Sequence, residues 1–230
     1  MKRLLLTTLL ASTVLVPAIS ANAADLPRRE RVEAPIELWN PWMIRVRALG
    51  VMPQKSDKSR VKLDGVGEPG SNISTTYTVV PELDISYFFT KNIAVELILG
   101  TTPHSVKGAG SLAGVGRIGR TWLLPPTLTL QYHFNLTDNI KPYVGAGVNY
   151  TIFYNNKSRG DFTGFKVNNA FGVALQAGVD FMIDKHWGLN VDVKKLWLRP
   201  TAKAWLGDTF VKTKAKLDPW LIGVGVTYKF

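Results

Sequence analysis

The chain contains no cysteine, which excludes disulfide bonds, thiolate metal sites and cysteine nucleophiles. Histidine is scarce as well, with only His104, His133 and His186. After the first 23 residues, no apolar run approaches the roughly 20 residues that a transmembrane helix needs. If such a chain crosses a membrane, it must do so as a closed β-barrel, because open sheet edges cannot face lipid.

The N-terminus has the layout of a secretory signal peptide. Lys2 and Arg3 form a basic start, Leu4 to Ile19 form an apolar stretch, and Ala21-Asn22-Ala23 supplies an A-x-A cleavage site. We therefore predict a signal peptide over residues 1–23 and a mature chain of 207 residues. The expected divisions of that mature chain are a periplasmic segment over 24–41 and a transmembrane barrel over 42–230.

The last eleven residues alternate between apolar positions and positions that are small or polar, with Leu221 as the one exception. A period of two is typical of a β-strand whose two faces meet different surroundings. Its apolar face consists of Trp220, Ile222, Val224, Val226, Tyr228 and Phe230. A strand of this kind that ends in a C-terminal Phe resembles the last strand of outer-membrane barrels and the signal read by the barrel assembly machinery. We take Tyr228 and Phe230 as that candidate assembly signal.

Seven further segments alternate in the same way. They cover residues 42–48, 82–89, 93–99, 127–134, 143–152, 171–181 and 187–194. Short polar connections alternate with long ones rich in Gly, Ser, Lys or Pro. Eight amphipathic strands joined in this manner predict an all-β fold, an eight-stranded antiparallel transmembrane β-barrel with long extracellular loops and short periplasmic turns.

The polar faces of these strands distinguish a membrane barrel from a soluble one. A lipocalin-like barrel points its apolar face inward around a ligand. Here the face opposite the apolar one carries Arg45, Arg47, Glu82, Asp84, Glu96, Asp180, Asp192 and Lys194. These charges cannot line an apolar interior, so the apolar face is expected to point outward into lipid.

Aromatic residues and basic charges mark the two ends of the predicted barrel. An outward-facing aromatic girdle is expected at the short-turn end. Its members are Tyr87, Phe89, Tyr132, Phe134, Phe181, Trp187, Tyr228 and Phe230. The long connections over 52–76, 100–126, 154–166 and 199–216 together carry a net charge of +10. Lipopolysaccharide phosphates are natural counter-ions for such loops, although a solvated basic surface explains them equally well.

Two motifs suggest chemistry that their context does not support. Gly114-Val-Gly-Arg-Ile-Gly119 matches the dinucleotide fingerprint, but it lies in a predicted external loop and not between a strand and a helix. His104 and Ser105 are adjacent in a strand and therefore point to opposite faces, so the histidine cannot easily activate the serine. We expect no catalytic residue, metal or cofactor, and the export signal argues against nucleic acid as a partner.

Several segments, in order and spacing, resemble the OmpW family of outer-membrane proteins. They are Pro125–Phe134, Lys141–Tyr150, Trp187–Val193 and Asp218–Phe230. The resemblance implies an eight-stranded barrel with a narrow, largely hydrophobic passage that is associated with uptake of small apolar molecules. The long basic segments at the first and last predicted loops are the least family-like parts of the chain.

An eight-stranded barrel is only wide enough to be filled by its own side chains. We therefore expect Arg45 and Arg47 to pair with Glu82, Asp84 or Glu96 and to plug the lower lumen, since pairing is how such charges are buried. Inward positions nearer the loops are less charged and form a candidate ligand pocket, unless they merely pack the rim. These positions are Leu49, Ile98, Phe153, Leu196 and Leu198.

Prolines suggest how a solute leaves such a pocket. We expect Pro103 to end the third strand and Pro125 and Pro126 to precede the fourth, and proline donates no hydrogen bond to a sheet. The hypothesis is a lateral portal between these strands; the alternative is that the prolines merely shape a loop base. A non-transporting barrel anchored to lipopolysaccharide by its basic loops is the other functional hypothesis.

Overall fold

The computed structural model describes residues 39–53 and 61–230. The predicted signal peptide and nearly all of the predicted segment 24–41 lie outside the described residues. Within the described ranges, no helix is both long and apolar enough to cross a membrane.

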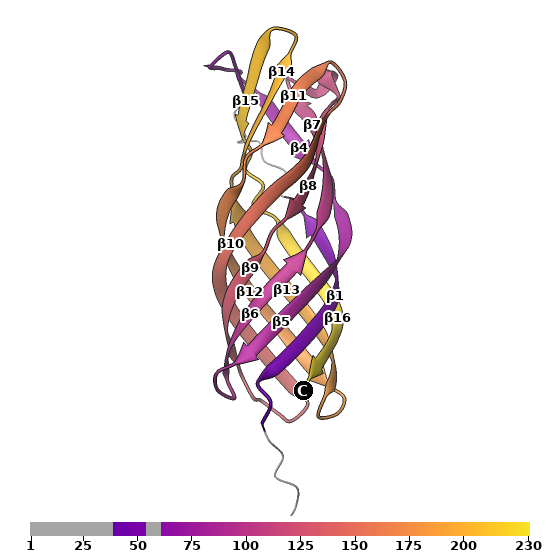
Figure 1. The fold of residues 1–230 in the computed structure, drawn as a ribbon, viewed down its shortest axis with the longest axis vertical. Helices are drawn as coiled ribbons and strands as arrows, with labels where there is room; N and C mark the ends of the chain where they lie inside the picture. The colour runs from indigo at the N-terminus through magenta and orange to yellow at the C-terminus, as the bar shows by residue number, and fades with distance from the viewer. Residues whose placement is uncertain (1–38, 54–60) are drawn as a thin grey trace, which may run out of the picture. The chain divides into compact units, whose positions relative to one another are not determined.

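Eight antiparallel strands close into a barrel, as predicted (Figure 1). In order around the barrel they are β1 (Trp42–Met52), β5 (Thr78–Phe88), β6 (Ile93–Gly100), β9 (Thr127–His133), β10 (Ile140–Ser158), β12 (Ala170–Met182), β13 (Trp187–Leu198) and β16 (Trp220–Lys229). The last strand pairs with the first, from Met43 opposite Lys229 to Met52 opposite Trp220. Closure leaves none of these strands with a free edge.

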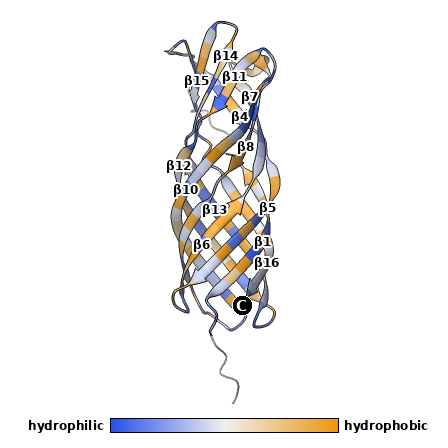
Figure 2. Ribbon diagram, viewed as in Figure 1, coloured by the Kyte–Doolittle hydropathy of each residue, from blue (hydrophilic) through white to orange (hydrophobic). Residues whose placement is uncertain are grey.

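The period of two in the sequence becomes an inside and an outside. In β1, Arg45 and Arg47 are buried in the lumen, whereas Val46 between them is 57% exposed. Figure 2 shows the same alternation of hydrophilic and hydrophobic residues along the other strands. The expected orientation, with the apolar face outward, is confirmed.

Aromatic side chains gather on the outside at the short-turn end. Trp42 packs edge-on against Tyr87, and Trp187 packs edge-on against Tyr228. Tyr228 in turn packs against Phe230, whose backbone N–H donates to the carbonyl of Trp42 at 3.2 Å. The predicted girdle is therefore present, and Phe230 lies where the last strand meets the first.

The long connections are more regular than expected. They form eight additional strands: β2 (Val61–Leu63), β3 (Val66–Gly67), β4 (Ser71–Thr75), β7 (Thr102–Gly110), β8 (Arg117–Leu124), β11 (Phe162–Val167), β14 (Thr201–Leu206) and β15 (Thr209–Lys214). We call these strands, with the upper part of β10, the extension. They enclose their own apolar cluster, which includes Ile73, Val106, Ile118, Phe165 and Val211.

The glycine-rich segment 114–119 is not followed by the α-helix that a dinucleotide-binding motif requires. It falls on the 3-10 turn η1 (Ala113–Val115) and the start of β8, with Gly116 at φ 67° between them. Because a dinucleotide fingerprint needs a strand before it and a helix after it, this arrangement does not form one.

Candidate functional site

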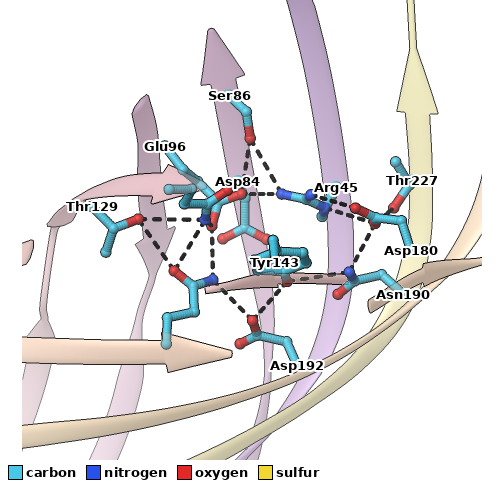
Figure 3. A network of polar contacts seen from close by, with 12 residues as sticks. Arg45, Asp84, Ser86, Glu96, Thr129, Tyr143, Asp180, Asn190, Asp192 and Thr227 are labelled. Atoms are coloured by element: carbon cyan, nitrogen blue, oxygen red, sulfur yellow. Dashed lines mark hydrogen bonds and ion pairs between the residues drawn. The ribbon is translucent and has the colours of Figure 1, made fainter. Parts of the chain in front are cut away.

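The lower lumen is filled by buried ion pairs that begin with Arg45 (Figure 3). Its guanidinium donates two hydrogen bonds to Asp180, from Nε to Oδ1 at 3.0 Å and from Nη2 to Oδ2 at 2.6 Å. Its Nη1 donates to Glu96 on β6. The two-pronged contact uses the planar geometry of the guanidinium, which a lysine does not have.

Arg47, one inward position higher on β1, holds a second group of carboxylates. Its Nη1 lies 3.1 Å from Glu82 and 3.2 Å from Asp84. Lys194 on β13 closes the group, with its Nζ 2.6 Å from Glu82 and 2.9 Å from Asp192. We call these eight residues the ion-pair layer: Arg45, Arg47, Glu82, Asp84, Glu96, Asp180, Asp192 and Lys194.

Neutral side chains satisfy much of the remaining hydrogen-bonding capacity of the layer. The hydroxyl of Tyr143 donates to Asp192 at 2.7 Å, and Thr227 donates to Asp180 at 2.7 Å. The amide of Gln176 donates to both Glu96 and Asp192. Every charged member is at least 97% buried, so the layer occupies the lumen as a packed polar network.

The structure joins more residues in this layer than the sequence-predicted plug contains. Arg45, Arg47, Glu82, Asp84 and Glu96 all belong to it, and Arg45 and Arg47 each contact predicted partners. The sequence identifies Asp180, Asp192 and Lys194 as inward-facing charges, but not as partners in these pairs. Parity reveals which face a charge occupies; the strand register decides which partner it meets.

Above the layer, on the side of the extension, lies a cavity of about 90 Å³. Its wall includes all five residues of the predicted pocket, Leu49, Ile98, Phe153, Leu196 and Leu198. Val51, Val80 and Leu221 extend the apolar surface, while Glu82 and Lys194 of the ion-pair layer also contribute to the lining. The cavity is thus apolar over most of its wall and meets charge where it borders the layer.

A smaller polar part of the wall is contributed by threonines and one histidine. The threonines are Thr75, Thr102, Thr121, Thr127 and Thr151. His104 Nδ1 lies 3.1 Å from the carbonyl oxygen of Thr76, and its Nε2 lies 3.3 Å from Thr102 Oγ1. Both ring nitrogens are therefore occupied within the protein wall, and Ser105 lies on the opposite face of the strand.

The ladder between neighbouring strands is interrupted in the cavity wall. Pairing of β6 with β9 stops at Ile98 opposite Thr127, and pairing of β7 with β8 starts at Thr102 opposite Leu123. The register is the same on both sides, so residues 99–101 face 124–126 without ladder pairing. We call this interval the seam. Gly100 and Pro125, one from each side, both line the cavity.

Of the three prolines predicted to border the portal, Pro125 and Pro126 lie in the seam and Pro103 does not. Pro125 and Pro126 fall between β8 and β9, where two consecutive residues lack a backbone N–H. The prediction that the third strand ends at Pro103 is wrong: β6 ends at Gly100, and Pro103 lies inside β7 opposite Trp122. Proline is compatible with an extended backbone, and Pro103 lacks only the N–H donor that another residue would contribute to the ladder.

Asn149 on β10 bonds the seam carbonyls from inside the barrel. Its Nδ2 donates to the carbonyls of Pro125 and Pro126 at 3.2 and 3.3 Å, and to Thr127 Oγ1 at 2.8 Å. Thr151 donates to the amide oxygen at 2.7 Å, which fixes the orientation of the amide. Nothing in the sequence marked Asn149, because its role depends on the register that places it beside the two prolines.

The outer side of the seam is bordered by polar and aromatic groups. Thr101 Oγ1 lies 2.6 Å from the hydroxyl of Tyr154 and 3.2 Å from the carbonyl oxygen of Leu123. The ring of Tyr154 in turn lies 6.2 Å from that of Trp122. Thr101 and Tyr154 are both exposed, so this contact lies on the outer surface beside the seam.

Comparisons with known proteins agree on the type of molecule. A model of the OmpW family matches residues 41–230. The outer-membrane protein y4mB of Sinorhizobium fredii is 50% identical over 222 residues, which cover 93% of this chain and 91% of that protein. The dibenzothiophene metabolism operon protein PahQ of Pseudomonas aeruginosa is 30% identical over 192 residues, or 83% and 89% of the two chains.

A solved structure extends the likeness to three dimensions. The crystal structure of the outer membrane protein OprG from Pseudomonas aeruginosa superposes with a TM-score of 0.74 at 29% identity. The match covers 82% of this chain and 95% of that one. The barrel fold is therefore shared with an outer-membrane protein of solved structure.

Proposed function

The chain belongs to the OmpW family and is an outer-membrane β-barrel, and from this premise we propose that it takes up small apolar molecules. In this proposal a solute enters from outside, occupies the cavity above the ion-pair layer and leaves sideways through the seam into the outer leaflet. Leu49, Ile98, Phe153, Leu196 and Leu198 bind it by apolar contact. The observation that carries the proposal is the seam, an interruption of the ladder that lies within the cavity wall.

The ion-pair layer supports a lateral exit because it occupies the lumen below the cavity. A solute that moved straight through would have to displace side chains that hold one another by charge and hydrogen bonds. Separating such a buried pair leaves an uncompensated charge and costs about 3–5 kcal/mol. The seam offers an exit without that cost, since no ladder bond has to break there.

The names of relatives favour an apolar solute. PahQ is described as a dibenzothiophene metabolism operon protein, and dibenzothiophene is a nonpolar aromatic compound. The cavity here has the corresponding chemistry, with aliphatic and aromatic side chains over most of its wall and few polar groups. We therefore expect uncharged hydrophobic solutes to be preferred over sugars or ions.

A disulfide across the seam tests the route. The natural chain has no cysteine, so Gly100→Cys and Pro125→Cys introduce the only pair. Uptake of a hydrophobic solute into liposomes should fall when this pair is oxidised and recover on reduction. A matched pair, Val144→Cys and Ala177→Cys, lies opposite across β10 and β12, away from the seam. Uptake that continues unchanged with the seam cross-linked would contradict the proposal.

The alternative is a barrel that transports nothing and is anchored to lipopolysaccharide by its basic outer segments. Contact with outer-membrane lipid is common to both functions, and insertion by the barrel assembly machinery is expected in both. Planar-bilayer conductance combined with liposome uptake separates them. A transporter of apolar solutes accelerates uptake with little ion conductance, whereas an anchored structural barrel accelerates nothing.

A further inference from the structure

Charged residues that face each other across neighbouring strands have opposite signs in the barrel lumen but the same sign in the extension. In the lumen they have opposite sign: Arg45 faces Asp84 and Arg47 faces Glu82. In the extension they are all cations, for example Lys107 opposite Arg117 and Lys157 opposite Arg120. Directly opposed like charges on one face of a sheet destabilise it, so this pattern requires an explanation beyond folding.

The longest run of opposed cations crosses four strands. Lys166 on β11 faces Lys203 on β14, Lys203 faces Lys212 on β15, and Lys212 faces Lys62 on β2. We call these four residues the lysine row. Since neighbouring strands lie about 4.7–4.9 Å apart, the row places a cation at each of four successive strands over about 14 Å.

The lysine row lies on the outward face of its sheet. The residues beside it, Val61, Val167, Ala202 and Val211, are buried in the apolar cluster of the extension. Lys62, Lys166 and Lys212 are exposed, and Lys203 is partly exposed. Within residues 39–53 and 61–230, no ion pair joins any of the four to a carboxylate.

Two aromatic rings continue the same face. Trp205 and Phe210 lie opposite each other on β14 and β15, two residues along from Lys203 and Lys212, with ring centroids 4.9 Å apart. Trp205 is 44% exposed. Exposed aromatic faces next to cations suit a ligand that has both charged groups and flat apolar surfaces, such as sugar rings.

We propose that the lysine row, with Trp205 and Phe210, binds an extended anionic polysaccharide at the cell surface. The extension faces the outside of the cell, because the short turns of an outer-membrane barrel are periplasmic. A polymer with regularly repeated carboxylates or phosphates complements a regular line of cations, and its binding removes the repulsion between them. This inference does not depend on solute uptake and concerns a different part of the molecule.

The test measures binding of polygalacturonate, a linear anionic polysaccharide, to the full-length protein in detergent, with neutral dextran as the blank. The variant Lys166→Gln/Lys203→Gln/Lys212→Gln should weaken binding about tenfold or more near physiological salt. The slope of log Kd against log salt should fall by about 2 to 3, as expected when three cations release counter-ions. Trp205→Ala should weaken binding without changing that slope.

A matched variant separates the row from net charge. Lys107→Gln/Arg117→Gln/Arg120→Gln removes three cations from the wall formed by β7 and β8 and should keep nearly full binding. Heat-modifiable mobility on gels confirms that both variants are folded. An equal loss in the two variants, or no binding to polygalacturonate at physiological salt, would overturn the proposal. Tighter, row-dependent binding of a DNA duplex at equal charge would replace polysaccharide by nucleic acid and also overturn it.

Discussion

Asn149 donates its side-chain amide to the carbonyl of Pro125 at a distance of 3.2 Å, from within the barrel and at the interrupted part of the ladder. In the continuous register of this seam, Gly100 stands opposite Pro125. The hydrogen bond from Asn149 therefore satisfies the Pro125 carbonyl, which lies close to the neighbouring strand. It does so without adding a backbone hydrogen bond across the seam.

Replacing Asn149 by Ala should change how the seam pairs. The carbonyls of Pro125 and Pro126 lose their inner donor, and Pro125 becomes free to accept a backbone N–H from the 99–101 side. One hydrogen bond contributes about 0.5–1.5 kcal/mol, so uptake should fall about 2- to 10-fold and amide exchange of Gly100 and Thr101 should slow. Thr151→Val, which removes only the bond that orients the amide, should have a smaller effect in the same direction.

The uptake and amide-exchange measurements on Asn149→Ala test different parts of the hypothesis. Slower exchange with unchanged uptake would mean that Asn149 controls the seam but solutes leave by another route. Unchanged exchange would mean that Asn149 does not hold the seam at all. Only a decrease in both agrees with a lateral exit maintained by this residue.

Replacing Arg45 by Met should strongly destabilise the barrel. Asp180 would remain buried without its guanidinium partner, and Glu96 would keep only Arg47, at 3.9 Å. Breaking a buried pair costs about 3–5 kcal/mol. Equilibrium unfolding in urea measures the loss. Arg120→Met, on the outside of the extension, is the control and should change the free energy of unfolding by no more than about 0.5 kcal/mol. Similar stability of the two variants would show that the ion-pair layer is dispensable.

Removing Phe230 should impair insertion into the outer membrane. The residue carries an exposed ring beside Tyr228 and a backbone N–H bonded to Trp42, at the junction of β16 and β1. The amount of heat-modifiable barrel in outer-membrane fractions is the measurement, and Phe134→Ala, another girdle aromatic, is the control. Normal heat-modifiable barrel from the truncated chain would disprove this assignment.

Asp184 should give a local pH dependence at the short-turn end. Its carboxylate accepts the backbone N–H groups of Trp187 and His186 at 2.7 and 2.8 Å, and these bonds lower the pKa of Asp184. A lowered folded-state pKa stabilises the turn above the ordinary aspartate range, about pH 4, and this contribution is lost as pH falls through the folded pKa.

Carboxyl NMR chemical shifts over acidic pH measure the Asp184 titration directly. The midpoint should lie below the ordinary aspartate value, and amide exchange of His186 and Trp187 should accelerate as it is crossed. Asp184→Asn retains an acceptor oxygen and should show no such acceleration. A midpoint at or above the ordinary value would refute the assignment.

Parity in the sequence predicted the eight barrel strands, because a period of two assigns each residue of a strand to one face. The same rule placed Arg45 inside and Phe230 outside. It did not assign Asp180 to Arg45, since partners far apart in the chain depend on the register of several strands. It also missed most of the extension, where strands such as Val61–Leu63 are too short for an alternating pattern to stand out.

The seam shows the same division. Two adjacent prolines at 125–126 are visible in the sequence, and β9 begins directly after them, as expected of the fourth strand. Pro103 was misassigned because a proline can lie within a strand when its missing donor is not needed. Asn149 became recognisable only once three strands were in place around it.

The ion-pair layer also bears on how the barrel comes together. Arg45 on β1 has one partner 51 residues away and another 135 residues away. Until strands from both halves of the chain surround it, its guanidinium lacks the partners that compensate for its burial, so a barrel assembled only in part gains little from enclosing it. Barrel closure should therefore be cooperative, because burial of Arg45 on β1 is favourable only once both β6 and β12 are in place.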